Sequence, residues 1–493
     1  MFHVLSTLTE LRTQPAVSSG DRPQEAIPAS GNMAAAATMI ITVFKKLKHI
    51  FEPDMSSYDP DAVIDHSLLE TCKPHHREVV QLAMTDLYGK RMEAILRLPA
   101  SWERFLVERM LNDKRDLLLA LTFLQVALWL TFTSVMQLLV LNPNNSWSWL
   151  WIVPHLLITW VVFGQRFILA MHYAAHIPLF SKKKIGFAAT LLNAIPTTVM
   201  CNFYGMPAGA YYVHHCIMHH QANNFFPHDV SSTMPYDRSS PLHFFAYVIN
   251  FMIHTFLYLP FYCIVKKRYD IAGVCAALLG TYMLAIKFLY AFNPLFFTCS
   301  LGIASVLGPF ALMLGNFSQH IFIDPDSPSS NYTLACNHVN APFNMLTFND
   351  GYHITHHVNS VCHWSEMPLN FIKNLDKYEQ GGAIIFKHIS FDEISFAVFS
   401  GERGLRRLAK HVVQITPKHK SEDELVAMFR RRLQPIVNKE TNLTSSRIGV
   451  FLANEVLWFS AWAVGWPLAK IPAMGTAVFY AIYHIGGLSW LNA

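Results

Sequence analysis

Long apolar stretches alternate with polar or basic segments from residue 117 onward. Leu117–Leu141 contains no charged residue, and Trp147–Ala170 follows it after a short polar turn. About 20 apolar helical residues cross the roughly 30 Å hydrocarbon core of a bilayer, so these two stretches predict a transmembrane hairpin. Ile271–Phe292 and Leu295–Leu314 predict a second hairpin, which turns at Asn293-Pro294.

Two further apolar stretches are less suited to a straight crossing. Ile185–Gly205 is interrupted by asparagines and a proline, so we expect a buried or a re-entrant segment. Phe244–Val265 runs into the basic triplet Lys266–Arg268, which favours the cytosolic side. We therefore expect Phe244–Val265 to lie along the membrane or to dip into it.

Basic residues flank the first hairpin on both sides. Lys114 and Arg115 precede it and Lys182–Lys184 follow it, so the positive-inside rule places both flanks in the cytosol. The expected fold class is all-α. It is a polytopic membrane protein with a four-helix transmembrane stem and a cytosolic helical cap.

The composition supports a membrane protein and excludes several other classes. Hydrophobic residues make up 52% of the 493 residues and charged residues only 14%, which is too apolar for an ordinary soluble domain. The net charge of +5 is small, and neither a basic tract with interleaved aromatic residues nor a glycine-rich phosphate loop stands out. No nucleic acid partner is therefore expected. The eight cysteines are scattered without a CxxC pair, which indicates neither a disulfide framework nor a zinc ribbon.

Three histidine clusters beside the apolar stretches carry the candidate chemistry. They comprise His172 and His176; His214, His215, His219 and His220; and His353, His356 and His357. Residues three or four apart share one face of a helix, so each cluster can direct several ring nitrogens the same way. Neutral imidazole is the commonest protein ligand for metals. Because each hairpin returns the chain to the side from which it came, we expect the clusters to form a metal site on the cytosolic face.

Helical positions distinguish the residues near these clusters. His214 lies roughly 140° around an α-helix from His219, so we expect it to contact a ligand instead of the metal. His320 follows the last predicted span, and Asn316 precedes it by one helical turn on the same face. We expect His320 to be a further ligand and Asn316 to complete the coordination directly or through water.

The order of the clusters resembles that of a known family. The motifs HxxxH, HxxxHH and HxxHH on a protein with two membrane hairpins resemble the histidine boxes of the membrane-bound fatty acid desaturase and hydroxylase superfamily. Tyr352–Pro368 closely resembles the third box with its proline-ended loop, and the pair Asn316 and His320 looks like the Asn-xxx-His element of acyl desaturases. The second box departs from the pattern, because three residues separate its histidines where many desaturases have two.

The resemblance implies a centre of two iron ions. Carried over position by position, its ligands are His172, His176, His215, His219, His220, His353, His356 and His357, beside the His320 expected above. The resemblance also implies O2 as co-substrate and a membrane lipid or acyl-CoA as substrate. No His-Pro-Gly-Gly haem motif is present, so electrons are expected from a separate protein of the cytochrome b5 or ferredoxin type. The expected location is the endoplasmic reticulum, with a plastid membrane as the alternative.

Desaturation of a lipid-borne acyl chain is the expected reaction, because the third box and its following loop resemble desaturases most. One alternative is acyl-chain or sphingoid-base hydroxylation, which uses the same boxes. Another is a non-catalytic membrane protein that binds or transports a divalent metal. Leu117–Leu141 and Leu295–Leu314 contain no ionisable residue to line an ion path, which favours the enzyme.

The chain is expected to divide into five segments. These are a flexible N-terminal segment 1–50, cytosolic lead-in helices 51–116, a desaturase-like membrane catalytic domain 117–372, a cytosolic cap 373–447, and apolar membrane-associated C-terminal helices 448–493. The last segment is interrupted by Glu455, Pro467 and Pro472, so it predicts either a helical hairpin in the membrane or two interfacial helices.

The shared cytosolic face can be tested by glycosylation mapping. Acceptor sites introduced beside Lys182–Lys184 and beside Phe348 should both stay unmodified, because an even number of crossings separates them. The natural acceptor sequence at Asn331 should be unmodified as well. Modification at only one of the two introduced sites would contradict the four-helix topology.

Overall fold

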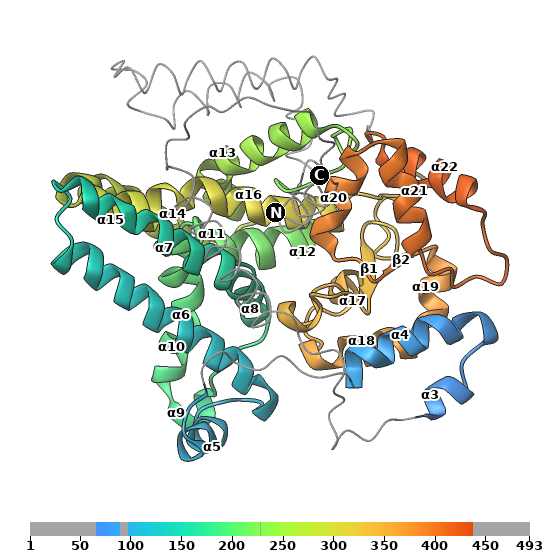
Figure 1. Cartoon of the computed structure of the whole chain (residues 1–493), viewed down its shortest axis with the longest axis horizontal. Helices are drawn as coiled ribbons and strands as arrows, with labels where there is room; N and C mark the ends of the chain where they lie inside the picture. The colour runs from blue at the N-terminus through green and yellow to red at the C-terminus, as the bar shows by residue number, and fades with distance from the viewer. Residues whose placement is uncertain (1–65, 89–96, 227, 437–493) are drawn as a thin grey trace, which may run out of the picture. The chain divides into compact units, whose positions relative to one another are not determined.

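The computed structural model describes residues 66–88, 97–226 and 228–436, and this part of the chain is mostly helical (Figure 1). The two terminal segments expected from the sequence, 1–50 and 448–493, lie outside the described residues. The expectation of a helical protein is confirmed, apart from one small parallel sheet.

The first hairpin begins with a straight apolar helix. α6 spans Leu117–Val135 and continues into a π-helical turn, and together they are long and apolar enough to cross a membrane. The returning limb contains α7 (Ile152–Leu156) and α8 (Gly164–His176), and it bends by 49° where α8 begins. A π-helical stretch, Leu157–Val162, lies just before the bend, and such stretches are a common cause of sharp kinks.

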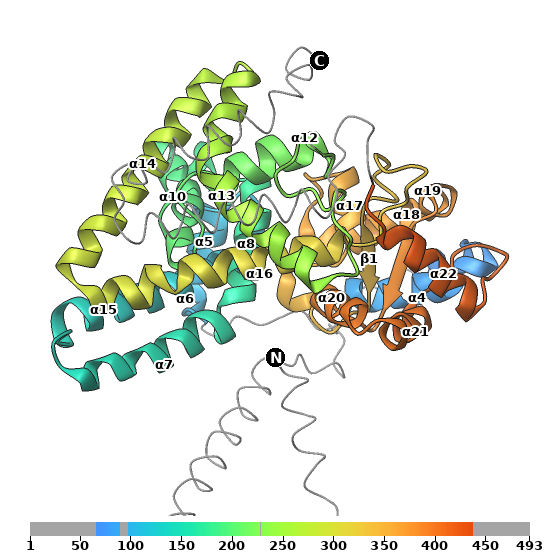
Figure 2. The same ribbon diagram turned by 90° about the horizontal axis from the view of Figure 1, so that it is seen from above.

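The second hairpin consists of α14 (Tyr269–Phe292) and a returning limb that contains α15 (Pro294–Phe297) and α16 (Ala304–Gln319). Both limbs are long and apolar enough to cross a membrane. At its turn, the Asn293 amide donates to the carbonyl oxygen of Gln137 at 3.1 Å, so the turns of the two hairpins lie together (Figure 1 and Figure 2). The histidines at the ends of α8 and α16 lie at the far ends of the returning limbs.

Two other apolar segments are short or bent. α10 (Phe187–Thr198) has 12 residues and is about 18 Å long, too short to cross the roughly 30 Å core alone. α13 (Pro241–Val265) bends by 70° between Ile253 and Tyr258. Pro260 lies two residues after the bend, and it lacks the backbone N–H that would bond to the carbonyl oxygen four residues earlier, inside the bend. Among the described residues, three helices are suited to cross a membrane, or up to five if each bent pair is one span. The predicted four-helix stem falls within this range, and which bent pair crosses stays a prediction.

The sheet is an element that the hydrophobic pattern did not predict, because each strand has only four residues. β1 (Cys336–Val339) pairs in parallel with β2 (Ile384–Lys387), and both strands are largely buried. In β1, the backbone N–H of His338 donates to the carbonyl oxygen of Gly351 at 2.7 Å. The sheet therefore anchors the turn that leads into the third histidine cluster.

Shorter helices surround these elements. They are α3 (Ser67–Glu70), α5 (Ala100–Arg109), α9 (Lys182–Ile185), α11 (Ala210–Tyr212), α12 (His220–Ala222), α17 (His353–Val358), α18 (Met367–Lys373), α19 (Leu375–Gly381), α20 (Phe391–Phe399), α21 (Glu402–His411) and α22 (Glu422–Leu433). The third histidine cluster lies on α17, and the second continues into α12.

The lead-in helix α4 (Arg77–Tyr88) lies beside α18 in both views (Figure 1 and Figure 2). Its buried face shares a hydrophobic cluster with Tyr352, the residue before the third histidine cluster. The buried carboxylate of Asp86 accepts hydrogen bonds from the Tyr352 hydroxyl at 2.7 Å and from the backbone N–H of Asn340 at 2.6 Å. The lead-in segment therefore supports the third cluster directly.

Arg238 joins three parts of the structure from a fully buried position. Its guanidinium donates to the backbone carbonyl oxygens of Thr233, Met234, Tyr236, Ile321, Arg432 and Gln434. These oxygens belong to the segment after the second histidine cluster, to the residue after His320 and to the end of α22.

The substitution Arg238→Met should destabilise the protein strongly. Each buried carbonyl oxygen that loses its donor costs about 1–3 kcal/mol, so we expect the free energy of unfolding to fall by about 3 kcal/mol or more. The melting temperature of the purified protein in detergent measures the effect. Arg430→Met on α22 is the matched control, because Arg430 is exposed and pairs only at the surface with Glu402. Equal melting temperatures of the two variants would contradict the bridging role of Arg238.

Candidate metal centre

Nine histidine side chains converge into two groups, each of which could hold a metal ion. Within each group, the candidate ligand atoms all lie within 4.8 Å of one another. The first group consists of His172, His176, His215, His220 and His356, and the second of His219, His320, His353 and His357. The structure thus brings together all nine histidines that were expected to be ligands.

The Nε2 atoms within a group face one another at short range. His356 Nε2 lies 2.8 Å from His172 Nε2 and 3.0 Å from His220 Nε2 in the first group. In the second group, His353 Nε2 lies 3.1 Å from His320 Nε2. Two nitrogens that bind one metal at about 2.1 Å and at right angles are about 3.0 Å apart, so the observed spacing fits coordination of a shared ion.

Three buried ring nitrogens in the groups lack a hydrogen-bond partner among the described residues: two are Nε2 atoms, and the third is Nδ1 of His353. The Nε2 atoms of His176 and His219 are buried and make no hydrogen bond to any described residue. A buried polar atom without a partner is unfavourable by about 1–3 kcal/mol, and a metal ion would satisfy both atoms together with their neighbours. The donor set therefore fits two metal ions that bind imidazole.

The second cluster lies on a π-helical turn, Val213–His219, that continues into α12. The α-helical geometry expected for this cluster is therefore wrong. In a π-helix the repeat joins residues five apart, and the Nε2 atoms of His215 and His220 lie 3.1 Å from each other. The wider turn lets His215 and His220 serve the first group while His219 serves the second.

Adjacent residues contribute to different groups at two places. His219 and His220 divide between the groups, and so do His356 and His357. The ring centroids of His220 and His357, which belong to different groups, are 5.0 Å apart. The two groups are therefore immediate neighbours that share the same two helical segments.

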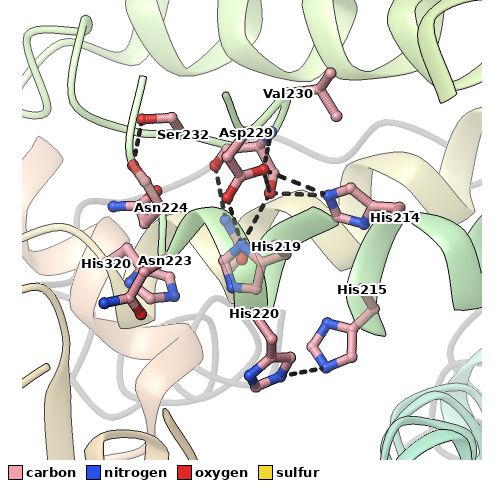
Figure 3. Close-up of polar contacts among 12 residues, drawn as sticks. His214, His215, His219, His220, Asn223, Asn224, Asp229, Val230, Ser232 and His320 are labelled. Atoms are coloured by element: carbon pink, nitrogen blue, oxygen red, sulfur yellow. Dashed lines mark hydrogen bonds and ion pairs between the residues drawn. The ribbon is translucent and has the colours of Figure 1, made fainter. Parts of the chain in front are cut away.

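A buried carboxylate orients His219 (Figure 3). Asp229 Oδ2 lies 2.6 Å from His219 Nδ1, so Nδ1–H donates to the carboxylate and Nε2 remains free for a metal. The backbone N–H and the hydroxyl of Ser231 both donate to Asp229 Oδ1 at 2.8 Å. Burial alone would raise the pKa of the Asp229 carboxyl, but the facing His219 holds that pKa well below its usual range.

Other rings have oxygen atoms beside the nitrogen that faces away from the group. The pairs are His320 Nδ1 with the Leu334 carbonyl oxygen at 2.9 Å, His357 Nδ1 with Asn223 Oδ1 at 3.1 Å, and His172 Nδ1 with Asp350 Oδ1 at 3.6 Å. The first two contacts are hydrogen bonds, which fix the orientation and the protonation of a metal-binding ring, and the third is too long to be one.

Burial favours the neutral form of His320 and of the third histidine cluster. Desolvation, followed by the neighbouring imidazoles, holds the pKa values of His353, His356 and His357 well below the ordinary value. Burial likewise lowers the pKa of His320 to about 3, and it raises the pKa of the Asp350 carboxyl to about 7. The neutral ring is the form that binds a metal, so this environment favours metal binding.

His214 and Asn316 both contact the segment that carries Asp229. His214 lies outside both groups, with Nε2 2.9 Å from the Ser231 hydroxyl (Figure 3). The amide nitrogen of Asn316 donates to the Ser231 carbonyl oxygen at 3.1 Å and to the Tyr247 hydroxyl at 2.6 Å. The contribution of Asn316 to coordination stays a prediction.

Residues 146–388 match the sequence profile of the fatty acid desaturase family. The matched range contains all nine histidines of the two groups. This region belongs to the fatty acid desaturase family. Comparison with curated proteins and with solved structures finds no match. Membership of the desaturase family supports an oxidoreductase activity of the desaturase or hydroxylase type.

Three residues that contact the ligands were not assigned a role from the sequence. Asn223 and Asp229 stand in a polar segment shortly after the second cluster. Asp350 stands three residues before the third cluster. A carboxylate or amide close to a histidine cluster was the available signal, because metal-binding histidines usually donate their other N–H to such a group.

Asp229→Asn should weaken metal binding by about 10–100-fold, since an uncharged amide orients and polarises His219 less well than a carboxylate. The metal content of the purified protein, measured at graded concentrations of a competing chelator, gives the change in affinity. Asp237→Asn is the matched control, because the carboxylate of Asp237 accepts hydrogen bonds from Ser239 and contacts none of the nine histidines. Equal metal retention in both variants would exclude the positioning role of Asp229.

Proposed function

We propose that the chain is an O2-dependent di-iron desaturase that introduces a double bond into a lipid-borne acyl chain. The observation that carries this proposal is the pair of adjacent all-histidine groups. A single metal ion would need only one such group, whereas the shared helical segments create two neighbouring sites. Membership of the fatty acid desaturase family supports the same reaction class.

In this proposal each group holds one iron ion. The ligands are His172, His176, His215, His220 and His356 for one ion, and His219, His320, His353 and His357 for the other. When bound, two imidazole-held iron ions supply the activation of O2 that is needed to remove hydrogen from an unactivated C–H bond. The protein's own part is to hold the rings in one arrangement, through Asp229 and Asn223, and to keep water away from them by burial.

An acyl chain suits the surroundings of the two groups. The histidines at the ends of α8 and α16 close the returning limbs of the two hairpins, and these limbs expose large apolar side chains such as Val153, Leu157 and Val306. Extended apolar surfaces of this kind mark contact with lipid. We therefore propose a membrane lipid or an acyl-CoA as the substrate, and a membrane such as the endoplasmic reticulum as the location.

The proposed reaction converts a CH2–CH2 unit, O2, two electrons and two protons into a CH=CH unit and two waters. Two electrons must come from outside, and we propose a separate protein of the cytochrome b5 or ferredoxin type as their donor. Hydroxylation by the same centre would instead place one oxygen atom on the chain and release one water. The likeness of Tyr352–Pro368 to the third desaturase box favours the alkene.

Expression in a host that lacks the activity should produce a new unsaturated acyl chain, detected by lipid profiling. His356→Ala and His219→Ala should each abolish this product, and each should lower the iron content from about two ions per chain to about one, because the two histidines belong to different groups. His419→Ala is the matched control, because His419 is exposed and lies outside both groups.

Three other outcomes would favour an alternative function or a smaller set of ligands. A new alcohol without a new alkene would establish the hydroxylase alternative. Zinc in place of iron, or iron well below two ions per chain, with no lipid product, would support a metal binder or transporter and exclude the enzyme. Full product and iron in either alanine variant would remove that histidine from the set of ligands.

A further inference from the structure

A third group of metal-ligating side chains lies outside the two histidine groups. It consists of His75, His76 and Glu379, whose candidate ligand atoms all lie within 4.8 Å of one another. His75 and His76 belong to the turn Pro74–His76 directly before α4, and Glu379 belongs to α19. The two histidines lie outside the range that matches the desaturase family.

The ring nitrogens converge on the carboxylate without forming hydrogen bonds to it. His75 Nε2 lies 3.3 Å from Glu379 Oε1, and His76 Nε2 lies 3.2 Å from Glu379 Oε2. Both nitrogen atoms are buried, and neither makes a hydrogen bond of adequate geometry to any described residue. Side chains of adjacent residues normally point in different directions. Here the centroids of the two rings are only 4.5 Å apart, and both rings face the Glu379 carboxylate.

The spacing and the chemistry suit zinc. Ligand atoms about 2.0 Å from a tetrahedral zinc ion lie about 3.3 Å apart, which is the separation observed between each nitrogen and the nearer carboxylate oxygen. Burial lowers the pKa of His76, which favours the neutral ring that binds a metal. Asp376 Oδ1 lies 3.9 Å from His76 Nδ1, the ring nitrogen that does not face Glu379, so Asp376 stands beside a ligand and a water molecule would supply the fourth ligand.

We propose that His75, His76 and Glu379 bind a zinc ion that fastens the start of α4 to α19. This site is separate from the two histidine groups. The other end of α4 carries Asp86, which bonds to Tyr352 beside the third histidine cluster. Zinc at the start of α4 would therefore hold the helix that supports the third cluster.

Replacement of Lys73 distinguishes a zinc site from a cluster held together only by ion pairs, because the two predict different effects on zinc binding. The Lys73 ammonium lies 3.0 Å from Glu379 Oε2 and 2.9 Å from Asp376 Oδ1, so it competes with a cation for the same carboxylates. If the group binds zinc, Lys73→Met should tighten zinc binding by roughly tenfold, because a neighbouring positive charge is removed. If the group is only an ion-pair cluster that lysine completes, the same variant binds no zinc and melts at a lower temperature.

The experiment uses the full chain, loaded with iron and purified in detergent. Titration with zinc against a chromophoric chelator should show one zinc ion per chain of micromolar affinity or tighter. His76→Ala and Glu379→Gln should lose this ion while they retain the iron of the wild type. His66→Ala is the matched control, because His66 is exposed on the same segment and lies outside the group.

Absence of zinc binding in the wild type, or an unchanged zinc content in Glu379→Gln, would overturn the proposal. Loss of iron with retention of zinc would contradict the proposed di-iron function and leave the zinc site standing. The two failures are therefore distinguishable from one set of metal analyses. Glu379→Gln and Lys73→Met change only partly exposed side chains, so the test does not depend on the folding of the His76 variant.

Discussion

Nine imidazoles in a buried space must each keep one nitrogen turned inward, and this constraint governs the residues around them. A neutral ring carries a single N–H, so the inward nitrogen can bind a metal only if the proton sits on the outward one. The outward nitrogen then needs an acceptor, which Asp229 provides for His219 and Asn223 for His357. The rings therefore require polar acceptors such as Asp229 in an otherwise apolar interior. These acceptors need hydrogen-bond donors of their own, as Ser231 is for Asp229.

The second constraint is that one short segment must serve two sites. In an α-helix, neighbouring residues point about 100° apart, which suits adjacent histidines that serve different sites. Residues five apart point about 140° apart, so they cannot easily serve the same site. The π-helical turn adds a residue to the repeat, so His215 and His220 approach each other while His219 faces the second group. The spacing of three residues within the second box, which departs from the common family pattern, is accommodated by this local change in the helix.

The sequence predicted the features that depend on composition and spacing. Long apolar runs identified the straight spans, and the three- and four-residue intervals identified the histidines, including His320 outside the boxes. Contacts between distant segments were not predictable in this way. Asp86 reaches Tyr352 across 266 positions, and the four-residue strand β1 finds its partner 48 positions later, so neither leaves a periodic signal in its own neighbourhood. The π-helical turn was missed because a pattern of histidines does not reveal one extra residue per turn.

The segment after the second box, residues 223–233, supports both His219 and His320. Asn223 and Asn224 both adopt left-handed backbone conformations, which asparagine tolerates better than most residues. Asn224 Oδ1 accepts from the backbone N–H of Thr233 at 3.0 Å, and the Thr233 hydroxyl donates to the carbonyl oxygen of His320 at 2.7 Å. Asp229 lies between these two anchored ends. A change that displaced it would therefore reach His219 directly and His320 through Thr233, so the second group depends on this segment as a unit.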